Sequence, residues 1–474
     1  MSHINTNPMT FHEGERKLHS LLHVPPQYNP TSPGLSPHAT RLLHMSSLLA
    51  LGTLDDEGRP WTTLLGGQPG FARSLGQSII EIRTVVDRKY DPVVELLVGE
   101  RQDGKVPEVG NYGRLVSALG IHLATRDRVK LAGKMFAGAL GDLDSEAAED
   151  ENGAAEIQAV FVIQQSLGNC PKYLNKKRII PSIPRPVLSS DSLPLSNLAL
   201  NLLAKADMFF VSASNQGFSM STNHRGGPPG FVRVAKNDNA GVVLVYPELS
   251  GNRLYQTLGN MWTTPKAGLM FPDFDSGDAL YITGTTEIVL GKDAAAILPR
   301  SNLVIRVNVD AARFVLQGLA FRGQAGERSP YNPPVRYLPT ERELPDIQIK
   351  DSRRVHAKLL ARDILTPTIA RFRFSLSDPA TGGWVPGQYV ALAFEDELSP
   401  GYSHMREDDP RSLNDDYVRT FTVSSSPRAG LPNDEFEITI RNVGVVTAFL
   451  FKQNIRAGLE VPLKGFGGAF SIDQ

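Results

Sequence analysis

Cysteine is almost absent from this chain of 474 residues. The single cysteine, Cys170, excludes an intrachain disulfide, and it excludes an iron-sulfur cluster, which normally needs four thiolate ligands. The histidines show no spacing typical of a metal site, such as H-x-x-x-H, so no metal ligand is predicted. Any electrons that the protein carries therefore travel on an organic cofactor.

The chain also lacks long apolar runs and a strong net charge. No stretch reaches the roughly 18 uninterrupted apolar residues of a membrane span, and the start has no apolar segment of signal-peptide length. The formal net charge of -1 gives no basic field for nucleic acid or an anionic membrane. We therefore expect a cytoplasmic protein whose partners are a small-molecule substrate or electron acceptor, with neither nucleic acid nor membrane among them.

What is present is the composition of packed globular domains. Hydrophobic residues make up 41% and charged residues 21%, and the length exceeds what one hydrophobic core usually serves. Proline-rich stretches that begin at Pro181 and Gly326 indicate linkers, because proline removes a hydrogen-bond donor and fixes φ. We therefore predict units at 1–180 and 195–325, a linker at 326–350, and a third unit at 351–474.

The first two units resemble each other. Residues 47–74 and 209–234 each contain a strand, a glycine-containing turn, a second strand and the motif GG-x-PGF, so that Phe71 and Phe231 occupy the same place. Further along, each copy has two alternating runs around a polar turn, beginning at Gly120 and Gly268. Two copies of one β-rich unit therefore follow each other.

The third unit alternates in the manner of short antiparallel strands. From Val355 onward, alternating runs with turn signals between them predict an antiparallel barrel. One helix-period segment, VVTAFLFKQNIRAG, interrupts the strands and predicts a helix that ends at the capping glycine Gly458.

The chemistry of the third unit gathers in the motif RTFT, residues 419–422. Alternation places Arg419 and Phe421 on one face of the strand and the two threonines on the other. A guanidinium offers a planar fork to phosphate oxygens, and an aromatic ring offers a surface on which a flat heterocycle stacks. Residues 444–447 then enter the helix, where free backbone N–H groups favour a pyrophosphate.

In this order, WVPGQYV, RTFTVSSSP, the G-x-x-T helix entry and LKGFGGAF resemble the flavin-binding domain of the ferredoxin-reductase family. The resemblance implies a six-stranded antiparallel Greek-key barrel that binds FAD, with Thr422 beside flavin N5 as the catalytic residue that tunes it by hydrogen bonding. The other FAD contacts that it implies come from Arg419, Thr420, Phe421, Gln388, Tyr389, Gly444, Val446 and Thr447.

This chain departs from that family at its end. A nicotinamide-binding domain follows the barrel in the family, whereas only Ser471 to Gln474 remain here. We expect a truncated form of a longer ancestor, a separate reductase, or NAD(P)H that binds without a dedicated domain.

The second copy of the repeat carries polar residues that the first copy lacks. Arg225 precedes its GG motif, and the segment SGNRLYQTLGN supplies further polar side chains, so that Arg225 and Arg253 are candidates for binding a monophosphate. The two copies resemble pyridoxamine-phosphate-oxidase-like split barrels, which bind FMN at a dimer interface. The resemblance implies a built-in pseudo-dimer with at most one good FMN site per chain. The candidate FMN residues are Arg225, Ser250, Asn252, Arg253 and Asn260.

These patterns together predict a mainly β protein with two split-barrel repeats and a Greek-key FAD barrel. We expect a flavin-dependent oxidoreductase that passes electrons from NAD(P)H through FAD to the split-barrel flavin, here FMN, or to a small substrate. One alternative is a non-enzymatic flavin-binding or electron-relay subunit that needs a separate reductase. The other is a haem-binding split-barrel module, and homodimerisation stays open.

Overall fold

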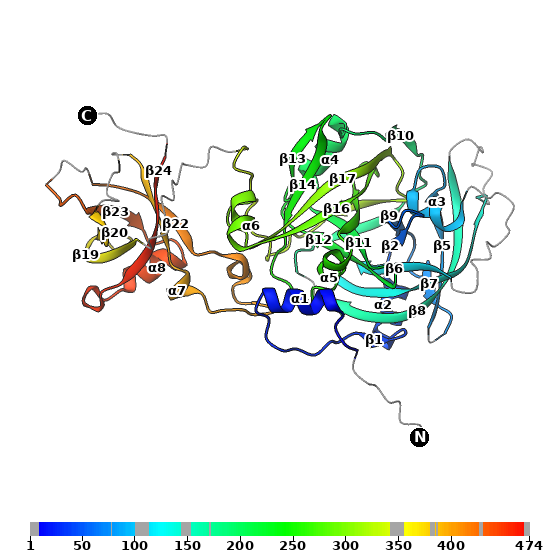
Figure 1. Ribbon diagram of the computed structural model, residues 1–474, viewed down its shortest axis with the longest axis horizontal. Helices are drawn as coiled ribbons and strands as arrows, with labels where there is room; N and C mark the ends of the chain where they lie inside the picture. The colour runs from blue at the N-terminus through cyan, green and yellow to red at the C-terminus, as the bar shows by residue number, and fades with distance from the viewer. Residues whose placement is uncertain are drawn as a thin grey trace, which may run out of the picture. The chain divides into compact units, whose positions relative to one another are not determined.

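The computed structural model describes residues 9–76, 78–99, 113–143, 153–169, 172–341, 355–379, 384, 387–425 and 430–468. The chain divides into two compact units, Met1–Leu338 and Pro339–Gln474. The division lies inside the stretch 326–350, which the sequence predicts to be a linker. Both units consist mainly of antiparallel β-sheet (Figure 1), so the predicted mainly β fold is confirmed.

The first part of unit 1 forms one antiparallel sheet. Its strands lie in the order β3-β2-β6-β7-β8-β5-β4, and β1 pairs with β8. The strands are β1 (Ser32–Pro33), β2 (Leu48–Leu54), β3 (Pro60–Gly66), β4 (Ala72–Ser74), β5 (Ile79–Asp87), β6 (Arg114–His122), β7 (Asp127–Gly141) and β8 (Ala154–Asn169).

The second sheet repeats this order strand for strand. Its strands lie in the order β12-β11-β15-β16-β17-β14-β13, and β10 pairs with β17 as β1 pairs with β8. The strands are β10 (Val187–Ser190), β11 (Met208–Asn215), β12 (Ser219–Gly226), β13 (Arg233–Asp238), β14 (Gly241–Pro247), β15 (Lys266–Pro272), β16 (Ala279–Leu290) and β17 (Leu303–Leu316). Shared strand order over two sheets is what a duplicated unit produces, and it supports the repeat seen in the sequence.

The proline-rich stretch from Pro181 is not a plain linker. It contains β10, which belongs to the second sheet, and it follows directly on β9 (Lys177–Pro181), which pairs with β18 (Phe321–Ala325) in a two-stranded sheet. Edge positions tolerate proline because one side of an edge strand makes no ladder hydrogen bonds. The sequence pattern therefore marked a sheet edge here.

A pseudo-two-fold relation joins the two sheets at a buried seam. The Thr62 hydroxyl donates to the Gly268 carbonyl over 2.8 Å, and the Thr222 hydroxyl donates to the Ser117 carbonyl over 3.1 Å. The two threonines hold matching register positions in their sheets, as do Ser117 and Gly268. Each sheet therefore gives the other the same hydrogen bond, as the two halves of a symmetric dimer do.

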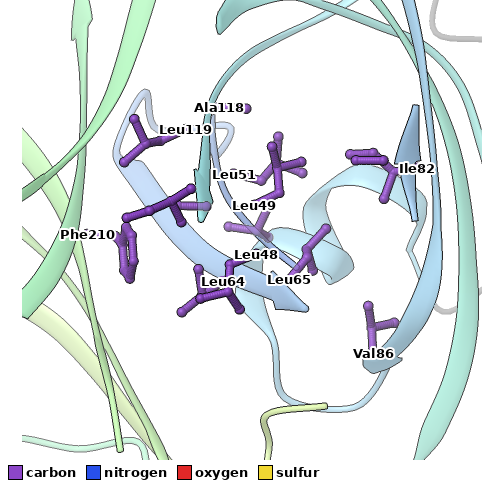
Figure 2. Close-up of a cluster of buried hydrophobic side chains, with 14 of the residues drawn as sticks. Leu48, Leu49, Leu51, Leu64, Leu65, Ile82, Val86, Ala118, Leu119 and Phe210 are labelled. Atoms are coloured by element: carbon purple, nitrogen blue, oxygen red, sulfur yellow. The ribbon is translucent and has the colours of Figure 1, made fainter. Parts of the chain in front are cut away.

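The hydrophobic core runs across this seam. Leucines of β2 and β3 pack with Phe210 of β11, and all of them are nearly inaccessible to solvent (Figure 2). Both β2 and β3 are buried along almost their whole length, so both of their faces are covered. Neither sheet can therefore leave the other without exposing a large apolar surface.

An amino-terminal helix, α1 (Glu13–Leu21), packs against α5 (Gln256–Thr263) of the same unit (Figure 1). A Cβ at Gly14 would lie 2.0 Å from the Gly259 carbonyl oxygen, so the two backbones touch. His12 caps α1 by accepting from the Gly14 N–H, and the Glu15 carboxylate accepts from the His12 N–H. This capping fixes the position of Glu15.

Unit 2 contains a six-stranded antiparallel sheet in the order β22-β21-β24-β19-β20-β23, which gives the predicted number of strands. Its strands are β19 (His356–Thr366), β20 (Ile369–Leu376), β21 (Tyr389–Ala393), β22 (Val418–Thr422), β23 (Glu435–Arg441) and β24 (Glu460–Gly467). Among the described residues no continuous ladder closes the sheet into a barrel. A single bridge between Val423 and Ile438 links its two end strands.

The remaining helices are short. They are α2 (Pro37–Met45), α3 (Pro92–Val98), α4 (Asn197–Lys205), α6 (Gly291–Ile297), α7 (Glu395–Leu398), α8 (Val445–Lys452), and the 3-10 turns η2 (Pro410–Asn414) and η3 (Ile455–Ala457). The helix predicted to reach Gly458 ends at Lys452, and Gly458 caps η3 in the left-handed conformation instead. Within the described parts of the chain, no helix has the length and apolar character to cross a membrane.

Candidate functional site

A cationic recess opens where β7 of the first sheet faces β12 of the second. It holds about 840 Å³ of empty space, part of which is open solvent. We define this cationic recess by six of its lining side chains, which are Arg128, Lys130, Lys172, His224, Arg225 and Arg253. Among the described residues that line it, Glu248 is the only one with a carboxylate. Positive charge therefore prevails in a concave site, as a bound anion requires.

The basic side chains at the floor of the cationic recess are almost inaccessible to solvent. Arg128, Lys130 and His224 are 3%, 6% and 7% exposed. Arg128 Nη1 lies 2.9 Å from His224 Nδ1. Because a guanidinium only donates, the imidazole must present a bare nitrogen and stay neutral. Burial, together with the charges of Arg128 and Arg225, holds the pKa of His224 well below its usual value.

Arg225 enters the cationic recess from β12 already oriented by a carboxylate. Its Nε donates to Glu248 Oε2 over 2.6 Å, and both side chains are largely buried. Burial opposes the charge on Arg225, but Glu248 outweighs it and raises the pKa of the guanidinium. Arg225 Nη1 donates to the His224 carbonyl over 3.0 Å, so two hydrogen bonds fix the direction of the guanidinium where it lines the recess.

Lys130 is the basic side chain of the cationic recess that loses its proton most easily near neutral pH. Burial, followed by the nearby charge of Arg225, lowers its pKa to about 7, while Glu15 acts in the opposite direction. Its ammonium donates to the Gln256 side chain. Burial likewise raises the pKa of Glu15 on α1 to about 7. Lys130 of the recess and Glu15 of α1, which is not among the lining residues, thus both have pKa values shifted toward neutrality.

The loop that carries Arg253 is held by three separate segments. Arg253 and Tyr255 adopt φ of 58° and 55°, a left-handed conformation that non-glycine residues rarely take. The Arg253 carbonyl accepts from Gln27 Nε2 over 2.8 Å and lies 2.9 Å from His19 Nε2. The Tyr173 hydroxyl donates to a carbonyl of the same loop over 2.8 Å. Such over-determined strain is typical of ligand-binding loops.

Three of the five predicted FMN residues come together here. Arg225, Asn252 and Arg253 line the cationic recess. Ser250 contributes a carbonyl to the bond with Tyr173, and it is not among the lining residues. Asn260 is 2% exposed and donates to the backbone of β11 and to a serine of β12, which ties α5 to the second sheet. Asn260 therefore has a supporting position beneath the recess.

Sequence reasoning missed the cations that the first sheet and its connection supply. These are Arg128, Lys130 and Lys172. A signal was present, because Arg128 and Lys130 alternate with two apolar residues in a four-residue stretch of β7 that is buried throughout. Charged side chains in a strand covered on both faces need a reason to be there. The fold supplies that reason by facing them toward the second sheet.

The pseudo-symmetric position carries a different set of residues. Counted back from the shared GG motif, Leu64 and Leu65 of β3 stand where β12 has His224 and Arg225. Figure 2 shows Leu64 and Leu65 among the apolar side chains of the core, and each is 3% exposed. Of these two equivalent positions, the one on β12 therefore carries basic side chains, and the one on β3 carries apolar side chains.

The first-sheet cations are replaced in the same way. Strand register places Ala279 and Tyr281 of β16 at the positions of Arg128 and Lys130. Tyr281 is buried, and its hydroxyl lies 3.4 Å from the Asp91 carboxylate. An anion would meet apolar and acidic groups at this second position.

In unit 2, the predicted FAD residues of β22 are divided between surface and core. Arg419 donates to both carboxylate oxygens of Asp415, over 2.9 and 2.7 Å. Thr420 and Thr422 are exposed. Phe421 is 9% exposed and packs in the hydrophobic core of the unit. That Phe421 lies near the flavin ring system therefore stays a prediction, and in this structure the ring packs against core side chains.

The predicted pyrophosphate site at the start of α8 is formed by backbone. Gly444 begins the helix, and a Cβ there would meet nothing within 4 Å, so a ligand can approach closely. The Thr447 hydroxyl accepts from the Val443 and Gly444 N–H groups, over 2.9 Å each, and thereby caps the helix. Val446 is 2% exposed in the core. Thr447 and Val446 can thus offer a ligand their backbone but not their side chains.

Gln388 and Tyr389 lie at the start of β21, and Tyr389 pairs with Thr422. The Tyr389 hydroxyl is buried and has no hydrogen-bond partner among the described residues, as is true of Trp384 Nε1. Burial raises the pKa of Tyr389. The last two residues of the predicted G-x-F turn, Ala469 and Phe470, lie outside the described residues.

No group of three histidine, cysteine or acidic side chains in the described parts of the chain is placed to hold a metal ion. No protein-family model matches this sequence, and no curated protein matches it.

Solved structures with partial likeness include proteins named as an oxidase and as a reductase. A putative pyridoxamine 5'-phosphate oxidase from Lactobacillus delbrueckii is 14% identical, with 29% of this chain and 95% of that chain covered and a TM-score of 0.18. An F420 reductase is 12% identical, covers 27% and 94%, and has a TM-score of 0.18. The CS-b5R domains of human Ncb5or, in the NAD+ form, are 13% identical, cover 51% and 61%, and have a TM-score of 0.19.

Proposed function

We propose that this protein is a flavin-dependent oxidoreductase that binds FMN in the cationic recess and FAD in unit 2, with NAD(P)H as the electron donor. The observation that carries the proposal is the convergence of Arg225, Asn252 and Arg253, which the sequence predicts as FMN contacts, in one concave cationic site. A monophosphate needs such a site, because its charge must be matched once water is removed.

The residues present fit a phosphate-bearing flavin. Arg225 is buried, oriented by Glu248 and held charged, so it meets a phosphate without further rearrangement. Arg253 projects from a loop whose backbone is fixed on both sides. When bound, the flavin supplies the redox chemistry, and the protein supplies binding, orientation and charge.

The residues of unit 2 support an FAD site less completely. Arg419, held by Asp415, and the open approach to Gly444 suit the two phosphates. The exposed Thr422 hydroxyl and the buried Tyr389 hydroxyl, the latter without a described partner, are available to the ring system. Val443 and Val445 add exposed apolar surface beside the helix start, at 77% and 45% exposure. A flat heterocycle would cover such surface.

The first experiment identifies the cofactor. Protein purified under native conditions is heat-denatured, and the released small molecules are identified by mass spectrometry. FMN together with FAD supports the proposal, whereas haem alone, or a colourless preparation that takes up neither flavin, contradicts it.

A second experiment separates an enzyme from an electron-relay subunit. The flavin-loaded protein is mixed anaerobically with NADH or NADPH, and flavin absorbance is followed. Bleaching by the protein alone supports an NAD(P)H-linked enzyme. Bleaching only after a separate reductase is added favours the relay subunit instead.

A variant assigns the FMN to the cationic recess. Arg225→Ala should weaken FMN binding roughly tenfold to a hundredfold, the range that corresponds to a charge-assisted hydrogen bond of about 1.5–3 kcal/mol. Arg306→Ala, at a half-exposed surface arginine of β17, is the matched control and should bind FMN normally. Equal FMN affinity in both variants would place the flavin elsewhere.

A further inference from the structure

Lys130 and Glu15 are two buried ionisable side chains to which the proposed function gives no role. Lys130 lines the cationic recess, and Glu15 acts on its charge from α1, which is fixed on α5 by the backbone contact at Gly14. Both side chains are nearly inaccessible, at 6% and 4% exposure. Two buried ionisable groups beside a phosphate site must respond when the phosphate arrives.

Charged and polar groups around Lys130 come from β7, β12, α1, α5 and the residue that follows β14. Arg128 lies two residues away on β7, while His224 and Arg225 face Lys130 from β12. Glu15 faces it from α1, and Gln256 of α5 accepts its hydrogen bond. Glu248 beyond β14 is already bound to Arg225. The positive groups therefore outnumber the negative ones, and Lys130 is the member of the set that can release its charge.

We propose that the cationic recess binds a doubly charged phosphate monoester together with one proton, and that Lys130 takes up this proton while Glu15 balances its charge in the absence of the anion. The inference rests on the proposed function, because the phosphate of FMN is such a monoester. It adds Lys130, Arg128 and Glu15 to the site, and it makes flavin affinity depend on pH.

The physical basis is reciprocal linkage. An anion placed beside Lys130 favours the ammonium form and raises the pKa of that lysine from about 7. By linkage, a proton that the anion draws in must also strengthen the binding of the anion. Affinity for the phosphate should therefore fall up to about tenfold per pH unit above about pH 7, until Lys130 also loses its proton in the complex.

The test is calorimetric titration at about pH 7.5, in several buffers that differ in ionisation enthalpy, with flavin-free protein. Three probes are used: FMN, riboflavin, which lacks the phosphate, and sulfate, which stays doubly charged throughout the range. FMN and sulfate should each bind with uptake of more than about half a proton, the free-base fraction of a group with pKa near 7. Riboflavin should bind more weakly than FMN and without proton uptake.

Variants assign the proton. Lys130→Arg keeps a permanent charge, so it should bind FMN without proton uptake. Lys130→Met should bind FMN more weakly, also without uptake, and it should fold because an apolar chain of similar length suits a buried site. Glu15→Gln removes the group that favours the ammonium, so it should increase proton uptake. Lys17→Met, at an exposed lysine of α1, is the matched control and should behave as the parent protein.

Two outcomes overturn the inference. One is FMN binding to the parent protein without proton uptake, which leaves the proposed flavin function standing. The other is undiminished uptake in Lys130→Arg, which assigns the proton to another group, Glu15 or His224, instead. The protein could also bind sulfate with proton uptake and bind no FMN. That result would support a site for an anion and a proton, and it would contradict the proposed flavin function.

Discussion

Arg225 and Arg419, two of the three arginines that the sequence marked for phosphate, each hold a carboxylate in the structure. Arg225 is bound to Glu248, and Arg419 is bound to Asp415. A carboxylate that uses one edge of a guanidinium fixes the direction of the other edge, which is the part that a phosphate would meet. The cost is competition, because the carboxylate and the phosphate repel each other. Binding therefore depends on further positive groups, and the cationic recess has more of them than β22.

Replacing Arg419 tests the FAD assignment. Arg419→Ala should lower the FAD retained by the protein about tenfold or more, because a charge-assisted bond to phosphate is lost. The ratio of FAD to protein after gel filtration measures this. Arg411→Ala, at an exposed arginine of η2, should keep its FAD. Full FAD content in Arg419→Ala would remove this arginine from the site.

Asp87 should make the stability of unit 1 depend on pH. Its carboxylate is 1% exposed, and it accepts from the Lys89 and Tyr90 N–H groups over 2.8 and 3.0 Å. Burial raises its pKa to about 7. The folded protein therefore binds a proton at this group that the unfolded chain releases near pH 4, so the contribution of Asp87 to stability decreases as pH rises from about 4 to 7.

Asp87→Asn keeps an oxygen acceptor for both N–H groups and removes the charge. At about pH 8 the variant should be more stable than the parent by up to about 4 kcal/mol, and near pH 4.5 the two should differ little. Denaturant unfolding at both pH values measures the difference. A stability gain that is equal at both pH values would mean that ionisation of Asp87 is not its cause.

At the scale of elements, the cationic recess depends on parts that lie far apart in sequence. Segment 9–29 supports it through Glu15, His19 and Gln27, although none of these residues belongs to either sheet. The contact between α1 and α5 holds this segment in place, and it requires glycine at both touching positions. Short elements thus position the site, while the long strands provide its floor.

Replacing Gly14 tests this support. The added Cβ of Gly14→Ala would lie 2.0 Å from the Gly259 carbonyl oxygen, so α1 must shift or detach. We expect a loss of about 1–3 kcal/mol in the free energy of unfolding, faster proteolysis of the amino-terminal segment and weaker FMN binding. Ser20→Ala, on the exposed side of α1, should change none of these. Unaltered proteolysis in Gly14→Ala would show that the backbone contact does not hold α1.

At the scale of the molecule, the two sheets have diverged so that they fit each other. A Cβ at Gly52 would lie 2.0 Å from the Ser212 Oγ, and strand register makes these two residues equivalent. The seam accepts one serine side chain at the pair of positions but not two. Two copies of the first sheet would lack that hydroxyl, and two copies of the second would clash. The pseudo-dimer is thus specific to one copy of each.

A compensating pair of substitutions tests this complementarity. Gly52→Ser should destabilise unit 1 by about 1–3 kcal/mol through overpacking at the seam. Adding Ser212→Gly should recover much of the loss, because the serine is then on the opposite side, although the Thr222 hydroxyl 2.7 Å from that Cβ must adjust. Thermal and denaturant unfolding of the single and double variants measure the recovery. If the two effects simply add, the residues do not share a space.

The sequence by itself determined the mainly β class and the repeat. These follow from local alternation and from turn residues, which act over a few positions. It also marked Arg225 directly before the shared GG motif, and Asn252 and Arg253 in the segment SGNRLYQTLGN. Local pattern could not show that Phe421 is in the core, since alternation gives two faces but not which of them is buried.

Only the tertiary structure brought Arg128 and Lys130 of the first sheet to Arg225 of the second, and Glu15 of α1 to Lys130. These residues are distant along the chain, and their meeting depends on the pseudo-two-fold packing of two sheets. The charge of Lys130 is likewise set by burial and by neighbours that arrive through folding. Chain order carries no direct record of such contacts, so the cationic recess emerges only in the folded chain.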